Sequence, residues 1–399
     1  MDVCTFISLH LLESNSSGNL ALSTTPPAVR SFRYFLTGIL STATTVVGLI
    51  GNLSLICIMY RPCMCARARV LLVSLLTWDN LLLLSTWTSL SLTTLITKGD
   101  FPILGQWIRV VRILYMLMNT SITGTVWITL VTTVDRYIGV CRPLTYRQSC
   151  SEVRVKAAVK IVSAGAVLFS IPRLFEYEVR RCNLFPGKGW VDIMLQSDLL
   201  ENPLYTVCYR LIGGLLFVSL IPFLVLMILA FRICRRLSIA QRERHKLSQA
   251  RFASTECTSN LKTIPPISGG LRFTDQIDRC LNKMMLAMLI KFLVSHILPI
   301  SVHMVQIIYG PSSRQMTLIY LVEVGNYLVL LHSASNFAVY FMCAPKVRRE
   351  AVRWARQYGG VDVPVLTTPS AETVRLAHLS TISTDSEYLQ VSQKDPADL

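Results

Sequence analysis

The residues of this chain that could do chemistry stand at the ends of long apolar segments or inside them. Asp135, Arg136 and Tyr137 close the apolar run 125–134, and Asp79 stands alone within another run. A carboxylate deep in an apolar helix is costly, so it indicates a functional or strongly paired site. A charged pair at the end of such a run is typical of the boundary between a membrane helix and the cytoplasm. The alternative, an ion pair on a soluble helix, is disfavoured by the apolar runs elsewhere.

The composition indicates a membrane protein. Of 399 residues, 52% are hydrophobic and 16% are charged, and the mean hydropathy is +0.48, whereas soluble proteins carry about 25% charged residues. The net charge of +16 could point to a nucleic-acid partner. The basic residues cluster between the apolar segments, however, as they do in cytoplasmic loops. We therefore expect the charge to reflect membrane topology, with no nucleic-acid partner.

Seven apolar segments reach the length of about 20 residues that a bilayer requires. We expect α-helices in all seven, because lipid leaves each backbone group to be satisfied within its own segment. The N-glycosylation acceptor at Asn15 suits an extracellular tail, which puts the carboxyl end inside. The sequence thus predicts a multi-pass, all-α protein of the plasma membrane with a tail over 1–32 and a bundle over 33–343. The predicted spans are 33–60, 70–96, 105–140, 156–175, 204–234, 281–309 and 316–343.

The string D-R-Y-I-x-V-C-x-P-L, from Asp135 to Leu144, resembles the end of the third transmembrane helix in rhodopsin-like (class A) G-protein-coupled receptors. The resemblance implies a seven-transmembrane helix bundle that signals to a heterotrimeric G protein, with Arg136 held by Asp135 at rest. It also implies hinges at two prolines and a switch in the last span, which ends N-F-x-x-Y where the family commonly has N-P-x-x-Y. The predicted activation residues are Asp135, Arg136, Tyr137, Asn336, Tyr340, Pro222 and Pro299.

Three further strings resemble the invertebrate FMRFamide-type neuropeptide receptors; they lie at 170–178, 292–299 and 325–340. The resemblance implies an amidated peptide ligand. A carboxylate would pair with the guanidinium of such a peptide, and aromatic side chains would pack its phenyl ring. Glu176, Glu178 and Glu323 are the candidate acids, and a solvated glutamate is the alternative for each. The predicted pocket residues are Tyr115, Met118, Asn119, Tyr205, Tyr209, His303, Gln306, Glu323 and Asn326.

The family resemblance gives Asp79 a place in a polar network that holds a sodium ion and water. The network would comprise Asp79, Asn52, Thr125 and Asn336. His332 stands where the family usually has asparagine, which weakens the case for sodium. Beyond this ion we expect no cofactor and no metal site. Lys291, inside the sixth span, has no role that the sequence assigns.

The external disulfide of the family is incomplete in this chain. Cys182 corresponds to its loop cysteine, but Val111 stands where the partner would be. Cys4 is the remaining external candidate, and the alternative is a free Cys182.

The inner face offers two partner surfaces. The segment 344–358 alternates basic and apolar residues at helical spacing, as an amphipathic cytoplasmic eighth helix on membrane lipid would. The segment 359–399 is predicted to be a disordered cytoplasmic tail. Its serines and threonines would be phosphorylated by a receptor kinase and would recruit arrestin in this family; they are Ser380, Thr381, Ser383, Thr384 and Ser386.

Two alternatives to a peptide receptor stay open. One is a divergent orphan receptor with another ligand or with constitutive activity. The other is a seven-span transporter or channel, in which Asp79 and Lys291 would be pathway charges. We do not expect an enzyme, because the sequence shows neither an H-E-x-x-H metal motif nor a G-x-S-x-G nucleophile elbow.

Overall fold

The computed structural model describes residues 26–60, 66–98, 107–142, 146, 151–182, 191–256, 286–302, 304–305, 316–343 and 347–353. The chain divides into two compact units, Met1–Glu350 and Ala351–Leu399. The first contains all the elements discussed below. In the second, residues 351–353 are helical.

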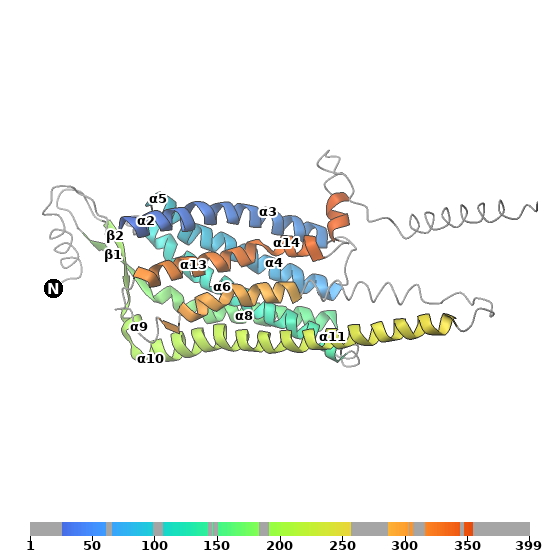
Figure 1. Ribbon diagram of the computed structural model, residues 1–399. Coiled ribbons are helices and arrows are strands. Elements are labelled where there is room, and N and C mark those ends of the chain that lie inside the picture. The colour runs from blue at the N-terminus through green and yellow to red at the C-terminus, as the bar shows by residue number, and fades with distance from the viewer. Residues whose placement is uncertain are drawn as a thin grey trace, which may run out of the picture. The chain divides into compact units, whose positions relative to one another are not determined.

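The first unit is built almost entirely from helices, several of which join end to end into longer rods (Figure 1). A π-helical stretch interrupts three of the rods. The elements in chain order are α2 (Pro27–Arg33), η1 (Tyr34–Leu40), α3 (Ser41–Met59), α4 (Ala66–Thr86), η2 (Trp87–Ser91), α5 (Leu92–Ile96), α6 (Trp107–Cys141), α8 (Glu152–Ser170), η3 (Ile171–Phe175), α9 (Asp198–Glu201), α10 (Pro203–Tyr205), η4 (Thr206–Leu220), α11 (Ile221–Glu256), α13 (Met316–Ala334) and α14 (Asn336–Cys343). Between α11 and α13 lies a further apolar helix, Leu286–Val302.

Six helices of the described part are long and apolar enough to cross a membrane, and Leu286–Val302 is a shorter seventh within the predicted sixth span. The prediction of a helical membrane bundle is therefore confirmed. The eighth helix stays a prediction, because residues 347–353 are helical but 344–346 and 354–358 lie outside the described residues.

Two boundaries and one element differ from the sequence-based expectation. The first helix begins at Pro27 rather than at residue 33, because proline suits the first helical position. The fifth extends to Glu256 rather than 234, since hydropathy marks the membrane thickness and not the helix end. The connection between η3 and α9 also holds an antiparallel hairpin, β1 (Tyr177–Cys182) and β2 (Val191–Gln196), so the chain is not wholly α-helical. Short hairpins in a connection leave no signal in a search for long apolar runs.

The helix α6 lies at the centre of the bundle, packed against α4, α8 and α11 (Figure 1). Its Val126 joins a buried apolar cluster with Leu226 of α11 and with Leu289 and Phe292 of the helix Leu286–Val302. The outside of the bundle is apolar as well: Phe231 is 67% exposed. Such exposure suits lipid, which imposes no cost on apolar surface.

Helix α3 approaches α13 closely at Gly48. A Cβ added to Gly48 would lie 2.6 Å from the Cβ of Ala334 and 2.7 Å from its Cα. These distances are shorter than any normal contact between carbon atoms, so this crossing requires a residue without a side chain.

We expect Gly48→Ala to lower the melting temperature of the purified protein in detergent. Overpacking costs about 1–3 kcal/mol, which exceeds the gain of about 1 kcal/mol from replacing a helical glycine. Gly325→Ala is the matched control, because its Cβ would lie 3.5 Å from Pro299, an ordinary contact. Equal melting temperatures for the two variants would show that the Gly48 crossing does not limit packing.

Candidate functional site

Asp135 and Arg136 form a buried ion pair near the carboxyl-terminal end of α6. The Arg136 Nη2 atom lies 2.6 Å from Asp135 Oδ2, and the two residues are 8% and 6% exposed. The same Nη2 donates to the hydroxyl of Tyr146 at 3.4 Å, whose ring lies under the guanidinium of Arg67 at 4.2 Å. An arginine held this way has its charge compensated within the chain.

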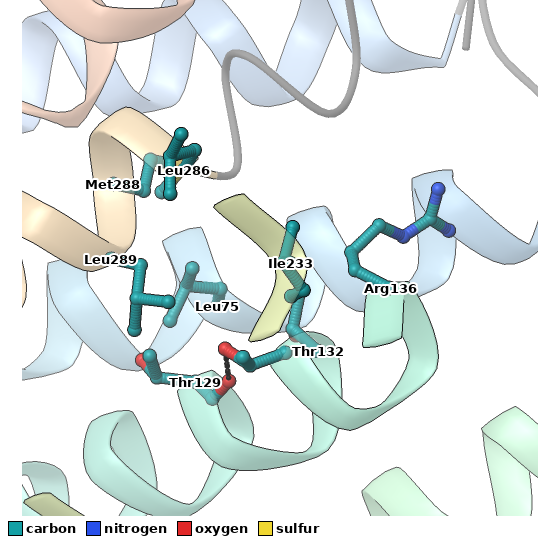
Figure 2. Close-up of a pocket in the computed structure, with 9 residues that line it drawn as sticks. Leu75, Thr129, Thr132, Arg136, Ile233, Leu286, Met288 and Leu289 are labelled. Carbon is teal, nitrogen blue, oxygen red and sulfur yellow. Dashed lines mark hydrogen bonds between the residues drawn. The ribbon is translucent and has the colours of Figure 1, made fainter. Parts of the chain in front are cut away.

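Arg136 also borders a small cavity between four helices (Figure 2). The cavity has a volume of about 30 Å³, enough for about two water molecules. Side chains from α4, α6, α11 and the helix Leu286–Val302 converge on it in Figure 2, with Arg136 at the edge. Any larger partner can reach this space only if these helices separate. The lining residues are Leu75, Thr129, Thr132, Thr133, Arg136, Ile233, Leu286, Met288 and Leu289.

A second polar site surrounds Asp79, which is fully buried in the middle of the bundle. Its Oδ1 accepts hydrogen bonds from Thr125 Oγ1 at 3.3 Å and from Ser333 Oγ at 2.9 Å. Its Oδ2 accepts one from Asn336 Nδ2. Asn52 Nδ2 donates to the backbone carbonyl of Ser333 at 2.9 Å. Three helices other than its own, α6, α13 and α14, thus supply the donors, and α3 supports them through Asn52.

The structure brings together most, but not all, of the predicted polar network. Asn52, Thr125 and Asn336 lie with Asp79, as described above. The ring of His332 packs instead against the rings of Phe292 and His296, with centroids 5.5 Å and 5.4 Å away. His332 joins the network through its carbonyl oxygen, which accepts a hydrogen bond from Lys291 Nζ at 2.7 Å.

Sequence reasoning missed Ser333 and assigned Lys291 no role, although each left a signal. Ser333 precedes Asn336 by three residues, a spacing that places side chains on one helix face. Lys291 is a lone cation in an apolar span, which should pair with a buried acid.

The predicted pocket tyrosines gather around a further buried acid, Glu176, near the amino-terminal part of α6. Glu176 is fully buried, with Arg173 Nη1 at 3.6 Å and the hydroxyl of Tyr205 donating at 3.0 Å. Arg173 Nη1 also donates to the hydroxyl of Tyr115 at 3.3 Å. The rings of Tyr205 and Tyr209 stack with centroids 5.0 Å apart. These residues from α6, η3, α10 and η4 form one aromatic and polar group, which we call the tyrosine cluster.

Tyr177 of β1 covers the tyrosine cluster from outside the spans. Its ring packs edge-on against Tyr115 with centroids 5.4 Å apart, and Arg112 Nη1 donates to its carbonyl at 3.5 Å. Burial raises the pKa of Tyr177 to about 12, so its hydroxyl stays neutral at physiological pH.

The candidate acids are already paired within the chain. Glu323, 8% exposed, lies 2.8 Å from Arg33 Nε and accepts a hydrogen bond from Thr37 Oγ1 at 2.6 Å. Glu178 lies 2.6 Å from Arg180 Nε at the surface. The alternative of solvated glutamates is therefore wrong for Glu176 and Glu323, because burial forces an internal partner on each.

Among the remaining predicted pocket residues that the structure describes, Asn119 alone joins the tyrosine cluster through a polar atom: it donates to the carbonyl of Tyr115 at 2.8 Å. The Met118 sulfur accepts a hydrogen bond from Ser89 at 3.7 Å. Asn326 of α13 is exposed. His303 and Gln306 lie outside the described residues.

Other predicted sites are placed only in part. Pro222 is the second residue of α11, where the π-helical η4 gives way to an α-helix, and Pro299 lies beside Gly325 of α13. Tyr340 is fully buried. Cys182 ends β1 opposite Val191. Asn15, Cys4 and the predicted phosphorylation sites 380–386 lie outside the described residues.

Comparison with known proteins supports the same class. The sequence model described as "7 transmembrane receptor (rhodopsin family)" matches residues 51–340. The FMRFamide receptor of Drosophila melanogaster is 23% identical over 333 residues, covering 79% of this chain and 53% of that protein. The FMRFamide peptide receptor frpr-18 of Caenorhabditis elegans is 28% identical over 134 residues, covering 33% of this chain and 31% of that protein.

The chain belongs to the rhodopsin family of seven-transmembrane receptors, because the family model spans well over half of it. It spans about half the length of the Drosophila relative and about a third of the worm relative.

We expect Arg33→Ala to destabilise the protein, because it leaves the buried carboxylate of Glu323 without its counter-ion. Breaking a buried pair from one side costs about 3–5 kcal/mol, and the partial exposure of this pair (17% and 11% of the side chains) reduces that to on the order of 1–3 kcal/mol. The double variant Arg33→Ala with Glu323→Gln should recover part of the loss in melting temperature. If the losses in melting temperature from the two single substitutions simply add in the double variant, Arg33 and Glu323 are not energetically coupled.

Proposed function

We propose that the chain is a plasma-membrane receptor for an extracellular, amidated FMRFamide-like neuropeptide, and that it passes the binding event to a heterotrimeric G protein. The rhodopsin-family match and the two FMRFamide receptors among the similar proteins support this reading. Membership of that family also favours a receptor over the transporter or channel alternative.

The observation that carries the proposal is the small size of the cavity beside the Arg136–Asp135 pair, at the end of the bundle that would face a G protein. A cavity of about 30 Å³ excludes a protein segment, and Arg136 is compensated by an internal acid. A partner that inserts between α6, α11 and the helix Leu286–Val302 would open this cavity and gain access to Arg136. A ligand that binds the open arrangement more tightly than the closed one would then raise the affinity for that partner.

The tyrosine cluster supports an aromatic, amidated ligand end. Its phenyl rings offer apolar contact, and the hydroxyls of Tyr115 and Tyr205 already exchange hydrogen bonds with Arg173 and Glu176. A guanidinium of the ligand would have to compete with Arg173 or Arg33 for the carboxylates. We therefore propose that the aromatic ring and the terminal amide of the ligand contribute more of the binding free energy than its arginine does.

The further partners of the proposed receptor follow from the family. A receptor kinase and arrestin would act on the tail serines and threonines, membrane lipid would hold the segment 344–358, and the amino-terminal tail would lie outside with glycosylated Asn15. A divergent receptor with another ligand is the main alternative, since Val111 replaces the usual cysteine partner of Cys182.

The test is a second-messenger assay in cells that express the chain. Peptides ending in Arg-Phe-amide should give a response, whereas the same peptides with a free carboxyl end should lose at least about tenfold in potency, because the extra charge must be desolvated in an aromatic site. Arg136→Ala should abolish the response at equal surface expression.

The matched control is Lys156→Ala, which removes an exposed cation whose ion pair with Glu152 contributes little. Its response should equal that of the unaltered chain. Equal potency of the amide and free-acid peptides would contradict the proposed ligand class. The absence of a second-messenger response to both peptides, with surface expression verified, would favour the divergent receptor.

A further inference from the structure

Lys291 reaches into the polar network from the helix Leu286–Val302. Its Nζ donates one hydrogen bond to the carbonyl oxygen of His332 at 2.7 Å and another to Asn336 Oδ1. Lysines near the ends of membrane helices usually extend toward the interface. Lys291 instead meets acceptors on α13 and α14 in the interior of the bundle.

Asn336 connects this ammonium to the buried acid. Its Oδ1 accepts from Lys291 while its Nδ2 donates to Asp79 Oδ2. The amide dipole of Asn336 is therefore aligned between a cation on one side and an anion on the other.

We propose that Lys291 is the resident counter-ion of Asp79, and that this chain's own ammonium takes the place that the family resemblance gives to a sodium ion. Asp79 is fully buried, and a buried carboxylate requires a compensating charge as well as hydrogen bonds. Because Lys291 is part of the chain itself, it supplies that charge regardless of which ions are present in solution.

The donor set around Asp79 does not fit an additional metal ion. A hard cation needs several oxygen ligands, but most oxygens of this network are engaged. Asn336 Oδ1 and the His332 carbonyl accept from Lys291, and the hydroxyls of Thr125 and Ser333 donate to Asp79. Asn52 Oδ1 is the one side-chain oxygen among these residues that has no hydrogen-bond partner in the described part of the chain, and one neutral ligand beside the acid falls short of the set that such a cation requires. A second positive charge beside an ammonium would also be repelled strongly where water is scarce. The ring of His332, which replaces the usual asparagine, faces Phe292 and His296 rather than the acid.

The first test needs no variant. The melting temperature of the purified chain is measured in sodium chloride and in choline chloride at matched ionic strength. We expect a difference of less than about 1 °C, because only a ligand that binds the native state raises its stability. A clear upward shift in sodium chloride would overturn the proposal.

The second test measures the coupling between the two charges. Lys291→Met and Asp79→Asn each leave one buried charge uncompensated, and each should lower the melting temperature by about 5 °C or more. The double variant removes both charges, so its loss should be smaller than the sum of the two by at least about 3 °C. Strict additivity would overturn the proposal.

Two control variants separate the ammonium's charge from its packing. Lys291→Arg keeps the cation and should keep most of the stability, which a purely steric role would not explain. Lys160→Met removes an exposed lysine of α8 and should combine additively with Asp79→Asn. Neither test uses a peptide or a G protein, so a failure here is distinguishable from a failure of the proposed function.

Discussion

The burial of Asp79 is the constraint on which the arrangement of this bundle depends. A carboxylate in an apolar interior is tolerated only when hydrogen-bond donors surround it and a positive charge lies near. Thr125, Ser333 and Asn336 meet that demand from α6, α13 and α14, and Lys291 adds the charge from the helix Leu286–Val302. One acidic side chain on α4 therefore fixes the relative register of helices that are far apart in the sequence.

The two ends of the bundle handle their charges in the same way. At the inner end Arg136 is held by Asp135, and at the outer end Glu176 and Glu323 are held by Arg173 and Arg33. Each pair is largely removed from solvent. Each of the strongly buried charges just named thus has an internal partner. In the proposed receptor, an incoming ligand or protein would have to compete with that partner.

The sequence was sufficient to predict the family, the helical spans and the members of the polar network that belong to recurrent motifs. The sequence was not sufficient to predict which residues contact one another across the bundle. Nothing in the sequence near Arg33 indicates that it contacts Glu323, since 290 positions separate them. The alternative of a solvated Glu323 was wrong because this partner could not be found from the sequence. The hairpin β1–β2 was missed because its strands have six residues each, too short for a search based on membrane spans. Lys291 was visible as an anomaly, but its acceptors on α13 and α14 depend on how the helices rotate.

The helix Leu286–Val302 connects the buried network to the inner cavity. Leu289 lines that cavity and belongs to the apolar cluster on α6 and α11, while Lys291, two residues later, binds Asn336 and His332. A helix is stiff over two residues, so moving Leu289 away from Arg136 also moves the ammonium relative to its acceptors. In the proposed receptor, opening this face would therefore have an electrostatic cost, because the hydrogen bonds of Lys291 in the buried network would have to change. A ligand bound at the other end of the bundle would lower that cost if it changed how α13 and α14 present the carbonyl of His332 and the amide of Asn336.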